Sequence, residues 1–422
     1  MKNFVAFTII ILLFSCKEDK NRDYDQKTNG VEEKGSLLDN EGKLNSGMYK
    51  ASLVVQDDEI LPFLFEVTSN NGLKIFNAEE VITIDEPTYR NDSVFINFPV
   101  YEGYIAAKLD GNTLTGSFIK ESLDRVVPFE AEKSSKRFTT KNKASKNISG
   151  NWETVFSPNS DEDMYIAKGI FKQKGDIVTG TFRTTTGDYR YLEGVMDGNQ
   201  MKLSAFDGAH AFLFTATVTD STMSGQFYSG NHWKEPFTAK RNEAYELPNA
   251  NSLTYLKDGY DKVEFSFPDA SGKMVSLNDA RFKGKVVLVQ IMGTWCPNCL
   301  DESKFYSDYY KQHKGEDIEF VALAFEYAKT KEKAFNNIKR LKERIGIQYP
   351  ILLAQVGTSS KLKANEKLPM LNHVLSYPTT IYIDKKGKVR KIHTGFNGPA
   401  TGSKYTEFVD EFEAYTKALI GE

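Results

Sequence analysis

Two cysteines separated by two residues form the part of the sequence best suited to chemistry. Cys296 and Cys299 enclose Pro297 and Asn298, and residues 300–311 contain neither Gly nor Pro, which predicts a helix. A cysteine at the first turn of a helix faces unpaired backbone N–H groups and the positive end of the helix dipole, which stabilise its thiolate. We therefore expect Cys296 to be the nucleophile of a thiol–disulfide exchange, and Cys299 to resolve the mixed disulfide.

An apolar run leads into this motif. Residues 286–292 are mostly β-branched or aliphatic and show no helical period, so they predict a buried central strand. Gly293 and Thr294 then turn the chain towards the cysteines. A buried strand, a turn and a CxxC motif at a helix N-terminus together indicate a redox site, whose potential is tuned by the dipeptide between the cysteines.

At this point residues 260–420 resemble the thioredoxin fold of the membrane-anchored thiol-disulfide oxidoreductases of the ResA and TlpA type. The segments that carry the resemblance occur in the expected order: residues 267–273, Leu277, residues 283–289, residues 293–299, Glu302 and residues 377–379. The resemblance implies an α/β thioredoxin-like domain at residues 260–422. It also implies that Pro378 is cis and faces the CxxC motif, and that Trp295, Pro297, Tyr377 and Pro378 contact the substrate. An ordinary trans turn proline is the alternative.

Glu302 matches an acidic residue of the ResA-like group. On a helix it lies near the turn below Cys299, where a carboxylate can take or return the proton of the resolving thiol. A solvated charge on the helix surface is the alternative. Gln290 lies where thioredoxin has a buried acid. Because that acid is missing here, Glu302 becomes the stronger candidate for the proton transfer. The sequence departs from the family because no proline follows soon after Glu302. Glu326, after the predicted strand at 318–325, is a further candidate to line the site.

Composition restricts the other classes of function. The formal net charge of -3 gives no basic field for nucleic acid. Of three cysteines, Cys16 lies in the opening segment, so only two thiols remain for the body of the chain. They cannot form a four-ligand zinc site unless histidines converge on them. We expect neither a metal nor a cofactor.

The first residues predict export and lipid attachment. A short basic start precedes an apolar run over residues 4–14, which is too short to span a bilayer. The run ends at Ser15 and Cys16, which resembles a bacterial lipoprotein box, so residues 1–15 are interpreted as a signal peptide and Cys16 as the lipidated residue. An ordinary signal peptide is the alternative. Residues 16–46 are polar and predict a flexible tether. We expect a cell-envelope protein that faces the periplasm, or the cell surface if residues 17–19 act as an export signal.

Residues 47–241 change to a period of two and carry turn signals at short spacing, which predicts an all-β antiparallel region. Residues 111–118, 175–182 and 220–227 echo one another, each as a tight turn that leads into a strand. We interpret the region as two meander repeats, at residues 47–133 and 147–241, forming either two small barrels or one larger sheet system. His210 and His232 have no ligand-like neighbours in the sequence, so a scaffold or recognition role is expected.

The C-terminal region alternates strands and helices. A hairpin is predicted around residues 265–275, further strands at 318–325, 351–353, 379–383 and 389–394, and helices at 330–345, 361–371 and 405–420. This pattern predicts a sheet of mixed direction.

The sequence therefore favours a lipid-anchored thiol-disulfide oxidoreductase that acts on protein disulfides outside the cytoplasm. Electrons would come from a membrane partner, by analogy with the family. One alternative is a binding lipoprotein with a β recognition region and an inactive CxxC motif. A peroxiredoxin is less favoured, because its PxxxTxxC pattern would need Pro and Thr where Val289 and Gly293 stand.

Overall fold

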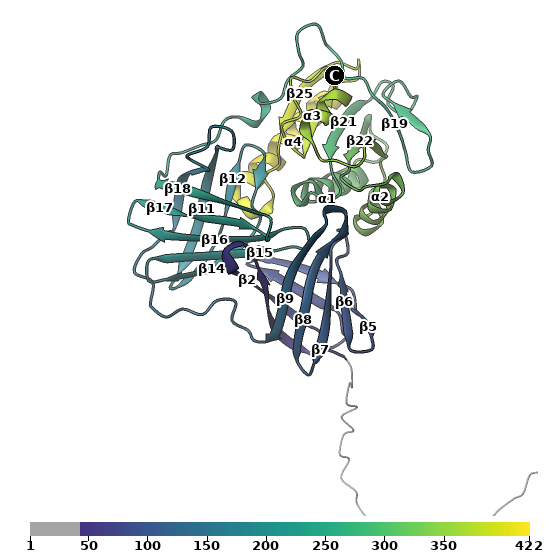
Figure 1. Cartoon of the computed structure of the whole chain (residues 1–422). Coiled ribbons are helices and arrows are strands. Elements are labelled where there is room, and N and C mark those ends of the chain that lie inside the picture. Colours follow the sequence, from purple (N-terminus) through teal and green to yellow (C-terminus); the bar gives the residue numbers. More distant parts are fainter. Residues whose placement is uncertain (1–42) are drawn as a thin grey trace, which may run out of the picture. The chain divides into compact units, whose positions relative to one another are not determined.

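The computed structural model describes residues 43–422, which all belong to one unit (Figure 1). The predicted signal peptide, Cys16 and most of the predicted tether lie outside the described residues. Leu44, which the sequence placed in the tether, is buried, so the packed part of the chain begins before Gly47. Within residues 43–422, no helix combines the length and apolar character needed to cross a membrane.

The first β region is a nine-stranded antiparallel sheet with the strand order β4-β3-β2-β1-β9-β8-β7-β6-β5. Its strands are β1 (Gly47–Val54), β2 (Ile60–Val67), β3 (Leu73–Asn77), β4 (Glu80–Ile84), β5 (Thr88–Arg90), β6 (Ser93–Asn97), β7 (Tyr104–Asp110), β8 (Thr113–Lys120) and β9 (Arg125–Lys133). The first strand pairs with the last, which leaves β4 and β5 at the two edges of the sheet.

The second β region repeats this plan but closes on itself. Its strands are β10 (Gly150–Phe156), β11 (Tyr165–Lys174), β12 (Ile177–Thr184), β13 (Gly187–Asp188), β14 (Leu192–Asp197), β15 (Gln200–Phe206), β16 (Ala211–Val218), β17 (Thr222–Ser229) and β18 (Trp233–Arg241). The first and last strands pair again, and the β11–β12 and β12–β14 pairings complete the ring. The question that the sequence left open is therefore answered by two separate sheets, of which the second is a closed barrel.

The repeated sequence motif has a packing reason. Its glycine lies in a strand, where a Cβ atom would come within 2.2 Å of a carbonyl oxygen of the adjacent strand. The phenylalanine two residues later is buried in the core. The glycines are Gly116, Gly180 and Gly225, and the phenylalanines are Phe118, Phe182 and Phe227. The motif thus sets a close approach of two strands and anchors them to the core.

The two β regions pack against each other through β15. The ring of Phe206 stacks on Phe63 of β2 with 4.2 Å between centroids. The Asn77 side chain donates to the carbonyl oxygen of Phe206 at 2.9 Å and accepts from its N–H at 3.1 Å. These buried contacts fix the open sheet against the barrel.

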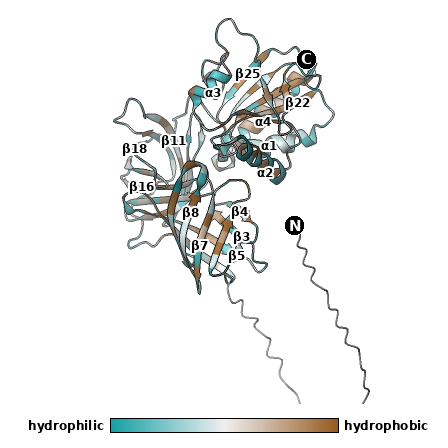
Figure 2. Ribbon diagram, turned by 45° about the vertical axis from the view of Figure 1, so that its right-hand side comes forward, coloured by the Kyte–Doolittle hydropathy of each residue, from teal (hydrophilic) through white to brown (hydrophobic). Residues whose placement is uncertain are grey.

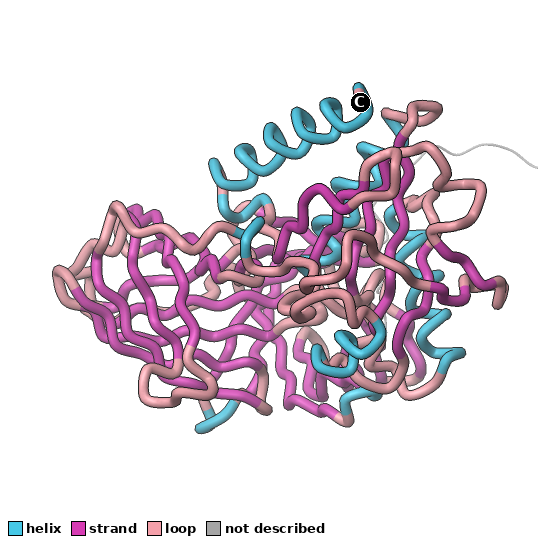
Figure 3. The backbone as a smooth tube through the Cα atoms, turned by 90° about the horizontal axis from the view of Figure 1, so that it is seen from above, coloured by secondary structure: helices cyan, strands magenta, loops and turns pink. Residues whose placement is uncertain are grey.

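The C-terminal region is a five-stranded mixed sheet with the order β23-β22-β21-β24-β25, preceded by a two-stranded hairpin. Its strands are β19 (Ser266–Pro268), β20 (Met274–Ser276), β21 (Val286–Met292), β22 (Ile318–Phe325), β23 (Ile351–Gln355), β24 (Thr379–Ile383) and β25 (Val389–Thr394). Its helices are α1 (Pro297–Gln312), α2 (Lys331–Ile345), α3 (Lys361–Lys367) and α4 (Ser403–Gly421). Figure 3 shows the long helix α4, which ends at the C-terminus, whereas the helices of the β regions are single short turns.

The central strands of this region are more buried than its helices. Every residue of β21 and β22 is buried, and β22 is coloured as hydrophobic in Figure 2, whereas α2 is mainly hydrophilic. Helix α2 turns Ala334, Ile338 and Leu341 inwards, the spacing of an amphipathic helix. The predicted helix over 361–371 was wrong at its end: α3 stops at Lys367, because Pro369 disfavours helical backbone in the residue before it.

Candidate redox site

Cys296 stands at the start of α1, where β21 ends. Its Sγ accepts a hydrogen bond from the backbone N–H of Cys299 at 3.2 Å, which caps the helix. Pro297 is the first helical residue, a position where its missing N–H costs nothing. The Cys296 thiol also donates to the carbonyl oxygen of Tyr377 at 3.4 Å. The Tyr377–Pro378 bond is cis, as the resemblance implied, so the structure brings the CxxC motif and this proline loop together.

The two thiols differ in exposure. Cys296 is 7% exposed, whereas Cys299 is fully buried, and neither forms a disulfide. Burial, together with the adjacent Cys296, raises the pKa of Cys299 well above its usual value. Cys299 is therefore a protonated thiol at neutral pH and needs a base before it can attack.

Glu302 lies one turn further along α1 and is fully buried, so the alternative of a surface charge was wrong. Its carboxyl accepts hydrogen bonds from Gln290 Nε2 at 2.8 Å, Thr380 Oγ1 at 3.0 Å and Tyr306 OH at 3.1 Å. Burial raises the pKa of Glu302 to about 7. The negative charge of Glu302 in turn contributes to the raised pKa of Cys299. Such a carboxyl can exchange a proton near neutral pH.

Glu326, the weaker candidate from the sequence, is also fully buried. It accepts hydrogen bonds from the backbone N–H of Thr294 at 2.8 Å and from Thr294 Oγ1 at 2.7 Å. Burial raises the pKa of Glu326 to about 7. Glu326 thus holds the turn that precedes Cys296. The contribution of Thr294 was missed, although a hydroxyl in the turn and a carboxyl just after β22 are both visible in the sequence.

Trp295 is fixed beside the cysteine. Its indole covers Gly293, where a Cβ atom would lie 2.4 Å from Nε1. The same Nε1–H donates to the carbonyl oxygen of Phe325 at 2.9 Å. The indole packs against Tyr327 and Tyr377 at centroid distances of 5.6 and 5.5 Å. Trp295 therefore forms a rigid wall on one side of Cys296.

The other side of the motif is covered by the second β region, a contact that the sequence did not predict. The segment Thr184–Arg190, between β12 and β14, lies against the start of α1. Asn298 Nδ2 donates to the carbonyl oxygen of Asp188 at 3.1 Å, and Arg190 donates to that of Pro297 at 3.3 Å. Pro297 and Asn298 therefore contact the barrel of the same chain.

A buried arginine joins all three regions at this contact. Arg190 forms ion pairs with Asp301 of α1, Glu80 of β4 and Asp207, which follows β15. Burial opposes its charge, but the surrounding carboxylates outweigh it and raise the pKa of Arg190 well above its usual value. Nothing in the sequence indicated these partners, because they are 17 residues or more away along the chain.

Within residues 43–422, no group of three or more His, Cys, Asp and Glu side chains is placed to hold a metal ion. His210 Nδ1 lies 3.5 Å from Asp207 Oδ2, three residues earlier, so the expectation that His210 has no ligand-like neighbour was wrong.

Comparison with known proteins identifies the C-terminal region. Residues 259–392 match the model of the AhpC/TSA family. The thioredoxin-like protein YneN of Bacillus subtilis is 30% identical over 140 residues, which are 33% of this chain and 73% of YneN. The thiol-disulfide oxidoreductase ResA of Bacillus subtilis is 31% identical over 140 residues, 33% of this chain and 69% of ResA.

A solved structure described as a thiol:disulfide interchange protein, thioredoxin family protein, from Chlorobium tepidum TLS is 22% identical. It matches 36% of this chain and 98% of its own, with a TM-score of 0.27. The two sequence relatives are at least 30% identical, and the match covers more than two thirds of each. The chain therefore belongs to the thioredoxin-like thiol-disulfide oxidoreductases.

Proposed function

We propose that the protein exchanges thiols and disulfides with protein substrates through the Cys296–Cys299 pair. The observation that carries this proposal is the position of Cys296 Sγ, which caps α1 and lies 3.4 Å from the carbonyl oxygen of Tyr377. A helix N-terminus favours the thiolate that must attack. The backbone of Tyr377, next to Pro378, lies beside Cys296, where a docked polypeptide can contact it. Trp295, Tyr377 and Pro378 are the residues that we assign to the substrate-binding edge, whereas Pro297, which the resemblance placed there, is buried against the barrel.

The exchange has two steps. The Cys296 thiolate attacks one sulfur of the substrate disulfide, and the other substrate sulfur leaves as a thiolate that takes up a proton. Cys299 then loses its proton and attacks Cys296 Sγ, which releases the second substrate thiol and forms the Cys296–Cys299 disulfide. Two electrons pass from the protein to the substrate, so a reductant must restore the dithiol before the next cycle.

Glu302 assists the second step as a proton acceptor. The Cys299 thiol is buried and its pKa is raised, so it does not ionise by itself at neutral pH. The carboxyl of Glu302, with its pKa raised to about 7, is an efficient base in this range. Gln290, Tyr306 and Thr380 hold the carboxyl in place through their hydrogen bonds.

The cellular setting follows from the same resemblance. We assign Cys16 as a lipid attachment site, an extracytoplasmic location facing the periplasm or cell surface, and a membrane protein as the source of electrons. Membrane extraction of cells that express Cys16→Ser tests the anchor, because the variant is expected in the soluble fraction. A variant that stays in the membrane would contradict lipid attachment at Cys16.

Insulin reduction with dithiothreitol as the electron source tests the exchange. We expect Cys296→Ser to lose the catalysed rate completely. Cys299→Ser is the matched control, since it keeps the attacking sulfur and should accumulate a mixed disulfide that mass spectrometry detects. Equal activity of wild type and Cys296→Ser would contradict the proposal.

A peroxidase is a second candidate because the matching family model is that of AhpC/TSA. It is less favoured, since the positions that would carry the PxxxTxxC pattern hold Val289, buried in β21, and Gly293, covered by the indole of Trp295. A peroxide-consumption assay decides between the two activities. Consumption faster than insulin reduction would favour the peroxidase.

A further inference from the structure

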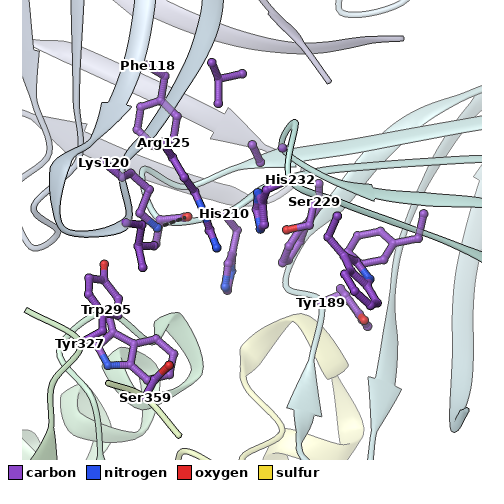
Figure 4. A pocket seen from close by; sticks show the side chains of 18 of the residues that line it. Phe118, Lys120, Arg125, Tyr189, His210, Ser229, His232, Trp295, Tyr327 and Ser359 are labelled. Carbon is purple, nitrogen blue, oxygen red and sulfur yellow. Dashed lines mark hydrogen bonds between the residues drawn. The ribbon is translucent and has the colours of Figure 1, made fainter. Parts of the chain in front are cut away.

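A cavity of about 480 Å³ lies beside Trp295, where the three regions of the chain meet. Strands β8 and β9 and the loop between them supply one wall, the second β region supplies another, and Trp295, Tyr327 and Ser359 supply the third. Figure 4 shows Trp295 and Tyr327 across the space from Lys120, Arg125 and His210. The volume is that of a site for a small molecule or a few side chains.

Aromatic rings form a large part of the wall. Rings from both β regions line the cavity together with Trp295, and Trp295 is held by its hydrogen bond to the carbonyl oxygen of Phe325. The other rings are Phe118, Tyr189, Phe212, Phe227, Trp233 and Tyr327, besides the imidazoles of His210 and His232. Such walls suit an apolar body in the ligand.

Two cations point into this aromatic space (Figure 4). Among the described residues, neither Lys120 nor Arg125 forms an ion pair. Lys120 is buried and donates only to the carbonyl oxygen of Ala209, at 2.9 Å. Burial lowers the pKa of Lys120 to about 8. Buried charges are normally paired, so this arrangement favours an anionic partner.

Other polar groups of the wall do not neutralise these cations. The carboxylate among the described lining residues is Glu235, whose oxygens accept hydrogen bonds from Ser157 Oγ at 2.6 Å and Tyr165 OH at 2.7 Å. His210 Nδ1 lies 3.5 Å from Asp207 Oδ2, a carboxylate oxygen that also pairs with Arg190, so His210 is not a free donor. The cavity thus combines aromatic rings with two cations and one carboxylate, Glu235, whose oxygens already accept hydrogen bonds.

The cavity borders the motif at Trp295, the residue before Cys296. The segment Thr184–Arg190 covers Pro297 and Asn298 through the contacts described above. Ser376, two residues before Pro378, donates to the carbonyl oxygen of Thr186 at 2.7 Å. The same segment of the barrel therefore also contacts the proline loop. The barrel thus covers the motif at Pro297, Asn298 and the proline loop, whereas the cavity borders it at Trp295.

We propose that this cavity is the recognition pocket of the redox site, and that it takes a carboxylate on an apolar body adjacent to the disulfide of the substrate. This inference rests on the proposed function and names its substrate class. The same chemistry occurs in a small free disulfide with carboxylates and in a protein cystine beside an acidic and an aromatic residue. Arg125 and Lys120 bind the carboxylate, and Trp295 packs against the apolar part.

Three small disulfides of different charge test the proposal: dianionic 3,3′-dithiodipropionate, neutral bis(2-hydroxyethyl) disulfide and dicationic cystamine. Each is reduced to two thiols while Cys296 and Cys299 form a disulfide, which dithiothreitol reduces again. Rates are divided by the uncatalysed rates with dithiothreitol, which removes intrinsic reactivity. We expect kcat/KM to favour the dianion over the neutral disulfide by about tenfold, as one well-placed charge contact provides.

Arg125→Gln should remove most of this preference, measured as the ratio of kcat/KM for the dianion to kcat/KM for the neutral disulfide, and Arg125→Lys should restore part of it. Lys172→Gln is the matched control, because Lys172 is an exposed cation on β11 outside the cavity. Lys120→Met provides a second test if Arg125→Gln is unstable. The proposed pocket is contradicted if wild type shows no preference for the dianion over the neutral disulfide, or if Arg125→Gln and Lys120→Met both leave that preference unchanged.

Two further experiments distinguish a failure of the pocket from a failure of the proposed function, and a small substrate from a protein substrate. Calorimetric titration with suberate, which has the shape of dithiodipropionate but no disulfide, should show binding that Arg125→Gln weakens by about tenfold. Binding without any disulfide reduction would mean that the proposed function fails while the pocket stands. Disulfide-linked Glu-Phe-Cys and Lys-Phe-Cys peptides then distinguish the sources, since a preference for the glutamate peptide supports a protein substrate and its absence supports a small one.

Discussion

The two β regions share one strand plan, but they contact the thioredoxin-like region differently. The first sheet contributes exposed ion pairs, between Asp124 and Lys329, Glu121 and Lys333, and Asp85 and Arg344, and its buried apolar side chains belong to the same cluster as those of the thioredoxin-like region. The second contributes the buried segment Thr184–Arg190, which contacts the CxxC motif itself.

The exposure of the charges shows what the difference means. The side chains of Lys329 and Asp124 are 54% and 80% exposed, whereas those of Arg190 and Asp301 are 6% and 11% exposed. Exposed pairs are screened by water and contribute little, but a buried ion loses much if its partner is removed. We infer that the buried Arg190 ion pairs contribute more to the position of the redox motif than the exposed pairs do.

The largest expected effect is that of Arg190→Met, which leaves Asp301, Glu80 and Asp207 without their common cation. We expect the free energy of unfolding to fall by about 3–5 kcal/mol, the usual cost of breaking a buried ion pair. Urea unfolding followed by tryptophan fluorescence measures it. Stability equal to that of wild type would show that the junction contributes no more than the exposed pairs.

Glu302 should give the next largest effect, through pH. Its pKa is raised by burial from 4.5 to about 7. Its contribution to stability is therefore fully present below pH 4.5 and is lost as the pH rises through about 7. Relative to Glu302→Gln, wild type should lose on the order of 3 kcal/mol between about pH 4 and about pH 8.

Unfolding curves of both proteins across this range measure the difference. Parallel curves for wild type and Glu302→Gln would contradict a raised pKa at Glu302.

Asp207 at the junction should behave in the opposite sense: burial opposes its ionisation, but His210 and Arg190 outweigh burial and hold its pKa below the usual value. Its contribution is present above pH 3.8 and is lost as the pH falls further.

Gly187→Ala should have an intermediate effect on the barrel contact. A Cβ atom at this position would lie 2.1 Å from Asn298 Nδ2, and the backbone has a φ of +148°. We expect a loss of about 1–3 kcal/mol, from strain and the displaced contact. Gly175→Ala is the matched control, since its φ is +64° and nothing lies within 4 Å of the added atom.

Combining Gly187→Ala with Asn298→Ala should recover part of the loss, because the clash is removed while the backbone strain stays. If the effects of the two substitutions on the free energy of unfolding are additive, Gly187 and Asn298 do not interact, which would contradict the contact between them.

The smallest effect is expected for Arg344→Met, an arginine variant matched to Arg190→Met but on an exposed pair with Asp85. We expect less than about 1 kcal/mol, and less still at high salt. The same urea unfolding measurement applies. A loss as large as that of Arg190→Met would remove the distinction between the two contacts.

Local pattern was sufficient for the parts of the molecule that depend on near neighbours. The apolar run of β21, the helix after Cys299 and the meander repeats all followed from periodicity and turn residues, since the residues that specify them are adjacent in the chain. The repeated glycines were visible as a motif, although the close strand approach that explains them was not. The end of α3 was wrong because the effect of Pro369 was not considered.

Cys296 and Cys299 could be named from the sequence because their spacing at the start of a helix is local, and Glu302 could be named from its match to the ResA-like group. Only the tertiary structure decided that the second β region closes into a barrel and that its segment Thr184–Arg190 covers Pro297 and Asn298. It alone placed Arg190 among three carboxylates, and the cations of β8 and β9 beside Trp295. These contacts join residues far apart in the chain, and their energies depend on burial and distance, which spacing along a sequence does not contain.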